Sequence, residues 1–191
     1  MIPYFYKLQS TLISEELGDK VVKIALDNLD KFVSYKGQKT GKEDNNNYYY
    51  GPLLGQEPEI QRLVDSCALE CFPIIMLHRP NITVIKHVDN PNRRNTVLSI
   101  PLFPKGGYSP TWFWKPKEPF EKWSLFEKLE EIELELVATV EFTDNMPVLL
   151  NTQKVHSLDN LTDSFRVQIQ LCFSDSFEAV YEKLRTNTLF L

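Results

Sequence analysis

The sequence has few cysteines and histidines, no long apolar run, and fewer basic than acidic residues. No apolar stretch approaches the roughly 18 residues that a membrane-spanning helix requires. The amino-terminal stretch MIPYFYKLQSTLISEELGDK lacks the cationic start and long apolar segment of a secretory signal. We therefore expect a cytoplasmic protein with no membrane partner.

The shortage of basic residues bears on nucleic acid. The chain carries 21 Lys and Arg against 26 Asp and Glu, a net charge of −5 and a pI near 5.3. Proteins that track a phosphate backbone usually have a basic electrostatic footprint. We expect no nucleic-acid partner.

The three cysteines are Cys67, Cys71 and Cys172. An odd number without a secretory context favours free thiols over a disulfide framework. Cys67 and Cys71 would share one face of a helix, but two thiols without nearby partner ligands do not make a zinc site. Cys67 and Cys71 are expected to be core residues, as free cysteines usually are.

The composition is that of an ordinary globular protein, with 42% hydrophobic and 25% charged residues in 191. We expect one domain over residues 1–191. Helical periodicity predicts a helix from Glu15 to about Phe32, with Ser14 as its N-cap, and a second from about Pro58 to Cys71. Both are amphipathic and suited to cover another layer.

That layer is predicted to be β-structure. After residue 72, short runs of β-branched and aromatic residues alternate with Pro, Gly and Asn. The predicted strands are Phe72–Leu77, Thr83–Val88, Thr96–Leu102, Glu131–Phe142, Val148–Thr152 and Phe165–Phe173. Many short strands in one domain indicate a sandwich or jelly roll.

Two stretches depart from this pattern. The first, GQKTGKEDNNNYYYG at 37–51, is polar and Asn-rich and predicts a mobile loop. The second, at 103–123, is rich in Gly, Pro and aromatics and lies between two predicted strands, as a binding loop would. Its aromatic residues either bind a partner or close one end of the sandwich. They are Trp112, Phe113, Trp114 and Trp123.

The stretch KHVDNPNRRNTVLSIP contains a candidate metal-binding pair. On a strand, His87 and Asp89 point to the same face about 7 Å apart. An open redox-metal site uses two imidazoles and one carboxylate on one face of the ion. Of the two other histidines, His156 lies near a strand-like run far along the chain, where a jelly roll returns beside the first pair. His78 is expected to be an ordinary side chain.

Strand 165–173, FRVQIQLCF, alternates between polar and apolar residues. Its polar face carries Arg166, Gln168, Gln170 and Cys172. The apolar face can pack under a helix or a sheet, whereas the polar face is costly to bury unless it lines a wet pocket or meets a charged ligand. An inward-facing arginine indicates an anion.

His-x-Asp at 87–89, a distant His156 and an Arg ten positions later resemble the signature of the Fe(II)- and 2-oxoglutarate-dependent dioxygenases. The lead-in IIMLHRPNITVIKHVD and the following RRNTVLSIPL resemble the aspartyl/asparaginyl β-hydroxylase branch, with prolyl hydroxylases less close. The likeness covers about residues 73–173. It implies a double-stranded β-helix (a cupin-like jelly roll) over 73–173, a helical cover and polar loop over 1–72, and a C-terminal segment over 174–191.

The resemblance also implies a ligand set. His87, Asp89 and His156 would bind Fe(II), and Arg166 would pair with the far carboxylate of the cosubstrate 2-oxoglutarate, since a guanidinium binds a carboxylate in bidentate fashion. Gln168 stands where the family often has Ser or Thr as a second contact to that carboxylate.

Further cosubstrate or substrate contacts are predicted at Arg93, Arg94, Thr96, Trp112 and Gln168. The implied reaction uses O2 to hydroxylate an unactivated C–H bond of a small molecule or peptide, with a peptide side chain or a free amino acid preferred. Two alternatives remain open: a cupin-like metalloenzyme that does not use 2-oxoglutarate, and a non-catalytic jelly-roll binding module.

Overall fold

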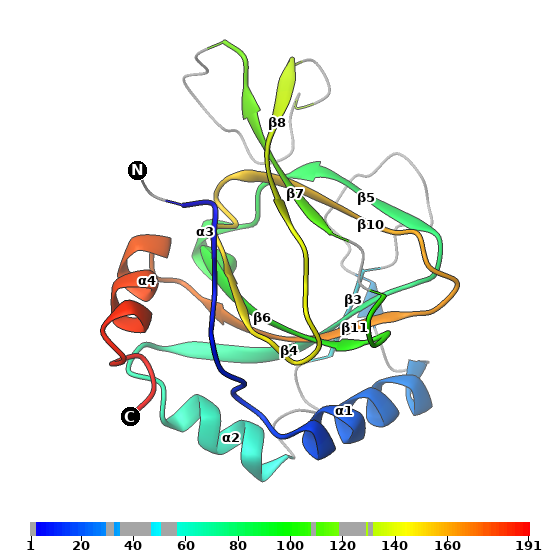
Figure 1. Cartoon of the computed structure of the whole chain (residues 1–191), viewed down its shortest axis with the longest axis vertical. Helices are drawn as coiled ribbons and strands as arrows, with labels where there is room; N and C mark the ends of the chain where they lie inside the picture. The colour runs from blue at the N-terminus through cyan, green and yellow to red at the C-terminus, as the bar shows by residue number, and fades with distance from the viewer. Residues whose placement is uncertain are drawn as a thin grey trace.

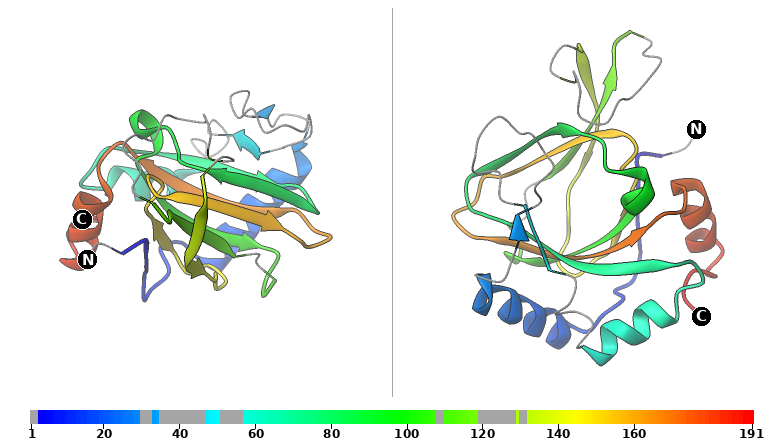
Figure 2. Two further views of the ribbon diagram at one scale, coloured as in Figure 1. Left: turned by 90° about the horizontal axis from the view of Figure 1, so that it is seen from above. Right: turned by 180° about the vertical axis from the view of Figure 1, so that it is seen from behind.

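The computed structural model describes residues 3–29, 33–34, 47–50, 57–107, 110–118, 129 and 132–191, and for residues 33–34 and 47–50 it describes the backbone only. The described strands form two antiparallel sheets that face each other (Figures 1 and 2). The larger sheet has the order β1 (Phe5–Lys7), β9 (Val148–Leu150), β6 (Thr96–Phe103), β11 (Arg166–Phe173), β4 (Cys71–His78), β3 (Asn47–Tyr50) and β2 (Val33–Ser34). The smaller sheet has the order β5 (Ile82–His87), β10 (Val155–Asn160), β7 (Thr111–Pro116) and β8 (Leu134–Val140).

The chain crosses repeatedly between the two sheets from β4 to β11. Strands β4, β6, β9 and β11 lie in the larger sheet, and β5, β7, β8 and β10 lie in the smaller one. Eight antiparallel strands wound in this way over two sheets form a jelly roll, also called a double-stranded β-helix. The predicted fold class is confirmed.

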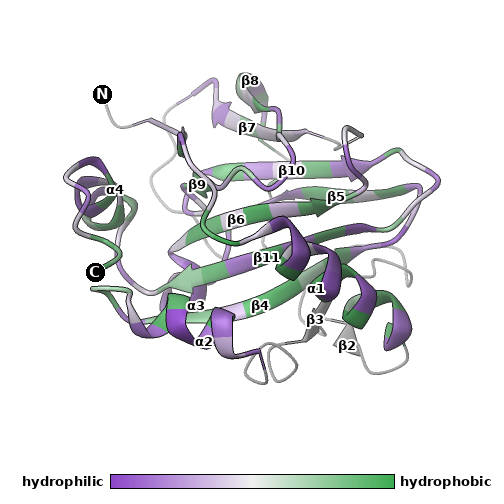
Figure 3. Ribbon diagram, turned by 60° about the horizontal axis from the view of Figure 1, so that its bottom comes forward, coloured by the Kyte–Doolittle hydropathy of each residue, from purple (hydrophilic) through white to green (hydrophobic). Residues whose placement is uncertain are grey.

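Helices cover the outer face of the larger sheet, as Figure 3 shows for α1 (Glu15–Asp27) and α2 (Pro58–Asp65). The predicted N-cap of α1 is present, with the Ser14 Oγ accepting from the Leu17 N–H at 3.1 Å. A third helix, α4 (Phe177–Arg185), adds Phe177 and Val180 to the same core. A short helix, α3 (Pro91–Arg94), follows β5.

The core sits between these helices and the outer face of the larger sheet. It contains Val21 and Ala25 of α1, and the β11 residues Val167, Ile169 and Leu171. The alternating residues of β11 point the other way, into the space between the sheets. Strand β11 therefore separates an apolar core from a polar interior, as its sequence pattern predicts.

Several sequence expectations need correction. Helix α1 ends at Asp27 and α2 ends at Asp65, earlier than predicted. Cys71 begins strand β4, so it does not share a helix face with Cys67; both thiols are half-buried and free.

The two predicted loops also contain strands. Asn47–Tyr50 of the predicted loop 37–51 pairs with β4. This pairing depends on a strand distant in the sequence, so the local composition does not predict it. Thr111–Pro116 of the predicted loop 103–123 is strand β7, where β-branched and aromatic residues outweigh the flanking Gly and Pro. The rest of the loop prediction at 37–46 and Trp123 lie outside the described residues. Among the described residues, no helix has the length and apolar character needed to cross a membrane.

Candidate metal centre

The fold brings His87, Asp89 and His156 together at one end of the smaller sheet. His87 is the last residue of β5, and His156 lies in the neighbouring strand β10, where the two are directly paired. Asp89 follows β5 rather than belonging to it, and its N–H donates to the Thr152 carbonyl at 3.0 Å. That backbone bond fixes the main chain of Asp89 beside the segment that precedes β10.

These three side chains form a compact cluster. Each offers one ligand atom, and these atoms lie within 4.8 Å of one another. The His87 Nε2 and Asp89 Oδ1 atoms are 3.5 Å apart, and the two imidazole centroids are 4.3 Å apart. All three residues are buried, with 8%, 5% and 9% exposure. Such spacing suits the coordination sphere of one ion.

Both imidazoles are oriented by the same local device. The His87 Nδ1 is 2.7 Å from the Ile85 carbonyl, and the His156 Nδ1 is 2.9 Å from the Lys154 carbonyl. A carbonyl oxygen only accepts, so each Nδ1 carries the proton and each Nε2 keeps a lone pair. Metal-binding histidines typically use their second nitrogen in this way.

The electrostatics keep Asp89 ionised and His156 neutral. Burial alone would raise the pKa of the Asp89 carboxyl, but the positive charge of Arg94 holds that pKa well below its ordinary value. Burial, and then the neighbouring His87, lowers the pKa of His156 to about 4. An anionic carboxylate and neutral imidazoles are the ligand forms that a divalent metal needs.

Arg94 braces the cluster from α3. Its Nη2 lies 3.3 Å from the Asp89 Oδ2 and donates to the Gln170 Oε1 at 2.8 Å. The Oδ1 of Asp89 thus faces His87 while Oδ2 faces Arg94. The adjacent Arg93 is exposed, and the Thr96 hydroxyl donates to the Asp175 carbonyl, so neither lines the interior.

A cavity of about 50 Å³ lies beside the cluster between the two sheets. It is lined by His87, His156, Arg94 and the polar face of β11, including Arg166 and Gln168. Arg166 is 1% exposed and the largest fully buried side chain among the described residues. Its guanidinium lies 4.7 Å from the Phe142 ring centroid, and its Nη2 donates to the Gln168 Oε1 at 3.3 Å.

His78 also lines this cavity, although the sequence analysis treats it as an ordinary side chain. It ends β4 directly opposite Arg166 of β11. In the sequence, His78 stands two residues after Met76, so both side chains lie on the same face of the strand. The pairing with β11 decides that this face points inward. Ser99 was also missed, and its hydroxyl donates to the Gln168 Oε1 at 3.0 Å.

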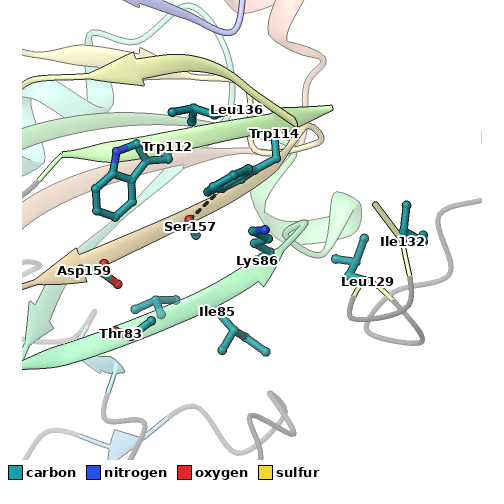
Figure 4. Close-up of a pocket in the computed structure, with 11 residues that line it drawn as sticks. Thr83, Ile85, Lys86, Trp112, Trp114, Leu129, Ile132, Leu136, Ser157 and Asp159 are labelled. Atoms are coloured by element: carbon teal, nitrogen blue, oxygen red, sulfur yellow. Dashed lines mark hydrogen bonds between the residues drawn. The ribbon is translucent and has the colours of Figure 1, made fainter. Parts of the chain in front are cut away.

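Trp112 lies on the opposite, outer face of the smaller sheet. There Trp112, Trp114 and Lys86 line a separate pocket of about 640 Å³ (Figure 4). The Trp114 Nε1 donates to the Ser157 Oγ at 2.8 Å, and the Lys86 Nζ lies 3.8 Å from a Trp114 ring centroid. Since successive strand residues face opposite sides, Ser157 belongs to this pocket and His156 to the interior.

The fold and the cluster define a jelly-roll protein with an internal group of two histidines and one carboxylate, and with a buried arginine nearby. The sequence matches no protein-family model and has no significant match among curated proteins. Solved structures do resemble it.

One is the non-heme α-ketoglutarate-dependent epimerase SnoN from nogalamycin biosynthesis (TM-score 0.59, 14% identity, covering 89% of this chain and 76% of that one). Another is the α-ketoglutarate-dependent carbocyclase SnoK of the same pathway (TM-score 0.57, 13% identity, 89% and 79%). A third is a prolyl-4-hydroxylase from Pseudomonas putida (TM-score 0.52, 10% identity, 89% and 91%). At these identities the likeness establishes the shared fold.

Proposed function

We propose that the protein is an Fe(II)- and 2-oxoglutarate-dependent oxygenase, with His87, Asp89 and His156 as the metal ligands. The observation that carries the proposal is the buried cluster, in which one ligand atom from each of the three side chains lies within 4.8 Å of the others and the His87 Nε2 is 3.5 Å from the Asp89 Oδ1. A facial set of two histidines and one carboxylate is typical of non-heme Fe(II) oxygenases. A structure of the similar SnoN contains Fe3+ and α-ketoglutarate.

The described residues fit this metal and cosubstrate. Two neutral imidazoles and a carboxylate suit a divalent ion of intermediate softness, and the Asp89 Oδ2 is already held by Arg94. When bound, iron with 2-oxoglutarate supplies the activation of O2 and the oxidation of a C–H bond. The protein then contributes binding, orientation and the exclusion of water.

Each residue has a distinct role in this proposal. Arg166 would bind the far carboxylate of 2-oxoglutarate, because its guanidinium is buried in the cavity wall on the sheet opposite the metal ligands. Gln168 would orient that guanidinium through its amide oxygen. The apolar residues Val84, Leu150 and Leu158 line the remaining wall and limit the access of water.

The cavity must enlarge for 2-oxoglutarate to enter. Its volume of about 50 Å³ has room for only one or two water molecules, each of which occupies roughly 30 Å³ in the liquid. Arg94 reaches across from α3 to β11, where it donates to the Gln170 Oε1, and so forms part of the wall of this cavity.

For the substrate we infer a peptide side chain or a free amino acid, hydroxylated at an unactivated carbon. This inference comes from the resemblance of residues 73–173 to the aspartyl/asparaginyl β-hydroxylases, and the structural similarity to a prolyl-4-hydroxylase is compatible with it. The net charge of −5 favours it over nucleic-acid dealkylation.

The test is an anaerobic titration with Fe(II) and then 2-oxoglutarate, followed by the visible metal-to-ligand charge-transfer band. We expect a band in the wild type, none in His156→Ala, and a much higher 2-oxoglutarate requirement in Arg166→Ala. Asp159→Asn is the matched control, because Asp159 lies in the same strand but lines the outer pocket.

Other outcomes would replace the proposal. Iron binding without a band at any 2-oxoglutarate concentration would indicate a cupin-like metalloenzyme with different chemistry. Absence of metal binding would indicate a binding module that keeps only the jelly-roll scaffold.

A further inference from the structure

His78 is a buried histidine with an unused hydrogen-bonding atom. The side chain is in the cavity wall, the residue is 3% exposed, and its Nδ1 has no hydrogen-bond partner among the described residues. A buried polar atom without a partner destabilises the folded protein and is rare in native structures. The Nδ1 of His78 is therefore available to a ligand that enters the cavity.

The position of His78 beside Arg166 is set by the larger sheet. The two residues are directly paired across β4 and β11, and residues paired in this way have neighbouring side chains on the same face. The Asn160 side chain holds the end of β4, because its Nδ2 donates to the His78 carbonyl at 3.3 Å and to the Arg79 carbonyl at 2.7 Å. His78 and Arg166 thus present one hydrogen-bonding imidazole and one guanidinium side by side.

This pair suits an anion with several acceptor oxygens. Burial, and then the positive charge of Arg166, holds the pKa of His78 well below its ordinary value of 6.5, so the ring is neutral at neutral pH. A neutral imidazole carries one N–H donor, and the tautomer protonated at Nδ1 would aim that donor at an incoming acceptor.

The amide oxygen of Gln168 does not supply a donor to such an anion. Its Oε1 already accepts from the Ser99 hydroxyl and from Arg166, and an amide oxygen repels a carboxylate. The amide oxygen of Gln168 therefore acts on the guanidinium, and His78 on the neighbouring strand β4 offers a further donor to the far carboxylate.

We propose that His78 is a cosubstrate-binding residue that donates its imidazole N–H to the far carboxylate of a 2-oxo diacid, alongside the Arg166 guanidinium. This rests on the proposed function, since it assumes that 2-oxoglutarate binds at the metal. His78 would then contribute to the preference for a diacid over a 2-oxo monoacid of the same length.

The experiment measures binding rather than turnover. Mn(II)-loaded protein is titrated calorimetrically with 2-oxoglutarate and with 2-oxopentanoate, which has a methyl group in place of the far carboxylate. The variants are His78→Leu, which removes the donor, and His78→Asn, whose amide nitrogen lies near the position of the imidazole Nδ1. Met76→Leu is the control, because Met76 lies on the same face of β4 and lines the same cavity.

We expect His78→Leu to weaken 2-oxoglutarate about 10-fold or more, as for loss of a hydrogen bond to a charged group, and to leave 2-oxopentanoate unchanged. His78→Asn should restore most of the preference for the diacid, and Met76→Leu should keep all of it. Because the preference is a ratio within one variant, a general loss of stability does not imitate this result.

Two failures are distinguishable. If the wild type and Arg166→Ala differ in 2-oxoglutarate affinity while His78→Leu matches the wild type, the role of His78 is refuted and the proposed function stands. If the wild type binds Mn(II) but neither 2-oxo acid, the proposed function is refuted, and the inference about His78 with it.

Discussion

At the scale of single residues, the candidate centre depends on short-range contacts that orient each side chain. His87 and His156 each donate from Nδ1 to the carbonyl two residues earlier in the chain. Asp89 is held by its own N–H and by Arg94. These contacts come from the protein itself and preorganise the three side chains.

Arg94 allows a direct test of that preorganisation. We expect Arg94→Ala to weaken Mn(II) or Co(II) binding by about 10- to 100-fold, as is typical when a group that orients a ligand is lost. The cause is loss of the ion pair to the Asp89 Oδ2, which frees the carboxylate to rotate. Metal affinity can be measured by competition with a chelator.

Arg93→Ala is the control for this experiment, because Arg93 is adjacent and exposed and should leave metal affinity unchanged. Tighter metal binding in Arg94→Ala would contradict the prediction. It would mean that repulsion between the guanidinium and the cation outweighs the positioning of Asp89.

His78 makes stability depend on pH. Its pKa is below 6.5 in the folded protein, so below that pH the unfolded chain binds a proton that the folded chain does not. This group therefore lowers the free energy of unfolding as pH falls below 6.5, by up to about 1.4 kcal/mol per pH unit. Urea unfolding of the wild type and of His78→Leu is measured between about pH 7 and about pH 5.5. The free energy of unfolding should depend less steeply on pH in the variant. Equal slopes would show that the pKa of His78 is the same in the folded and unfolded states and would contradict the prediction.

At the scale of elements, β11 performs two tasks through its alternating residues. The face with Val167, Ile169 and Leu171 packs in the helix-covered core, while Arg166, Gln168 and Gln170 line the cavity. All eight residues of the strand are buried. A shift of one residue in register would put arginine into the apolar core, so the pairing with β4 and β6 is strongly specified.

The core face of β11 should carry much of the stability. Ile169→Ala removes a side chain with 0% exposure and is expected to lower the free energy of unfolding by about 2–5 kcal/mol. Leu136→Ala, at a position with 50% exposure in β8, should cost less than about 1 kcal/mol. Chemical denaturation of both variants gives the comparison, and similar losses would contradict the assignment of the main core to the larger sheet.

At the scale of the whole molecule, the two sheets supply different residues of the candidate site. The candidate metal-ligand cluster belongs to the smaller sheet and the segment after β5, whereas Arg166 and His78 belong to the larger sheet. The cavity between them is lined from both sides. A ligand that spans the cavity would therefore tie the two sheets together.

Ligand binding should stabilise the folded chain as a whole. At about 100 times its dissociation constant, a bound ligand adds about 2.7 kcal/mol, which for a chain of this length raises the Tm by roughly 5–10 °C. We expect this from Mn(II), and a further rise from 2-oxoglutarate. Thermal unfolding monitored by circular dichroism measures both shifts. Neither should occur in His156→Ala, and a rise there would place the bound ion elsewhere.

The sequence by itself determined the features that depend on local periodicity and composition. The two faces of β11, the N-cap of α1 and the strands β4, β5, β6, β8, β9 and β11 follow from alternation and spacing over a few residues, whereas β7 and β10 were not predicted. The order of residues along the chain also showed the candidate site: the His-x-Asp pair, the distant His156 and an Arg ten positions later.

The tertiary structure alone decided which of these residues meet. The pairing of His156 with His87, and of His78 with Arg166, arises between strands far apart in sequence. Pairing between strands far apart in sequence also places Trp112 on the outer face of the smaller sheet and Asn47–Tyr50 beside β4. The physical reason is that strand register is specified by burial across the whole sheet, so a short stretch of sequence does not encode it.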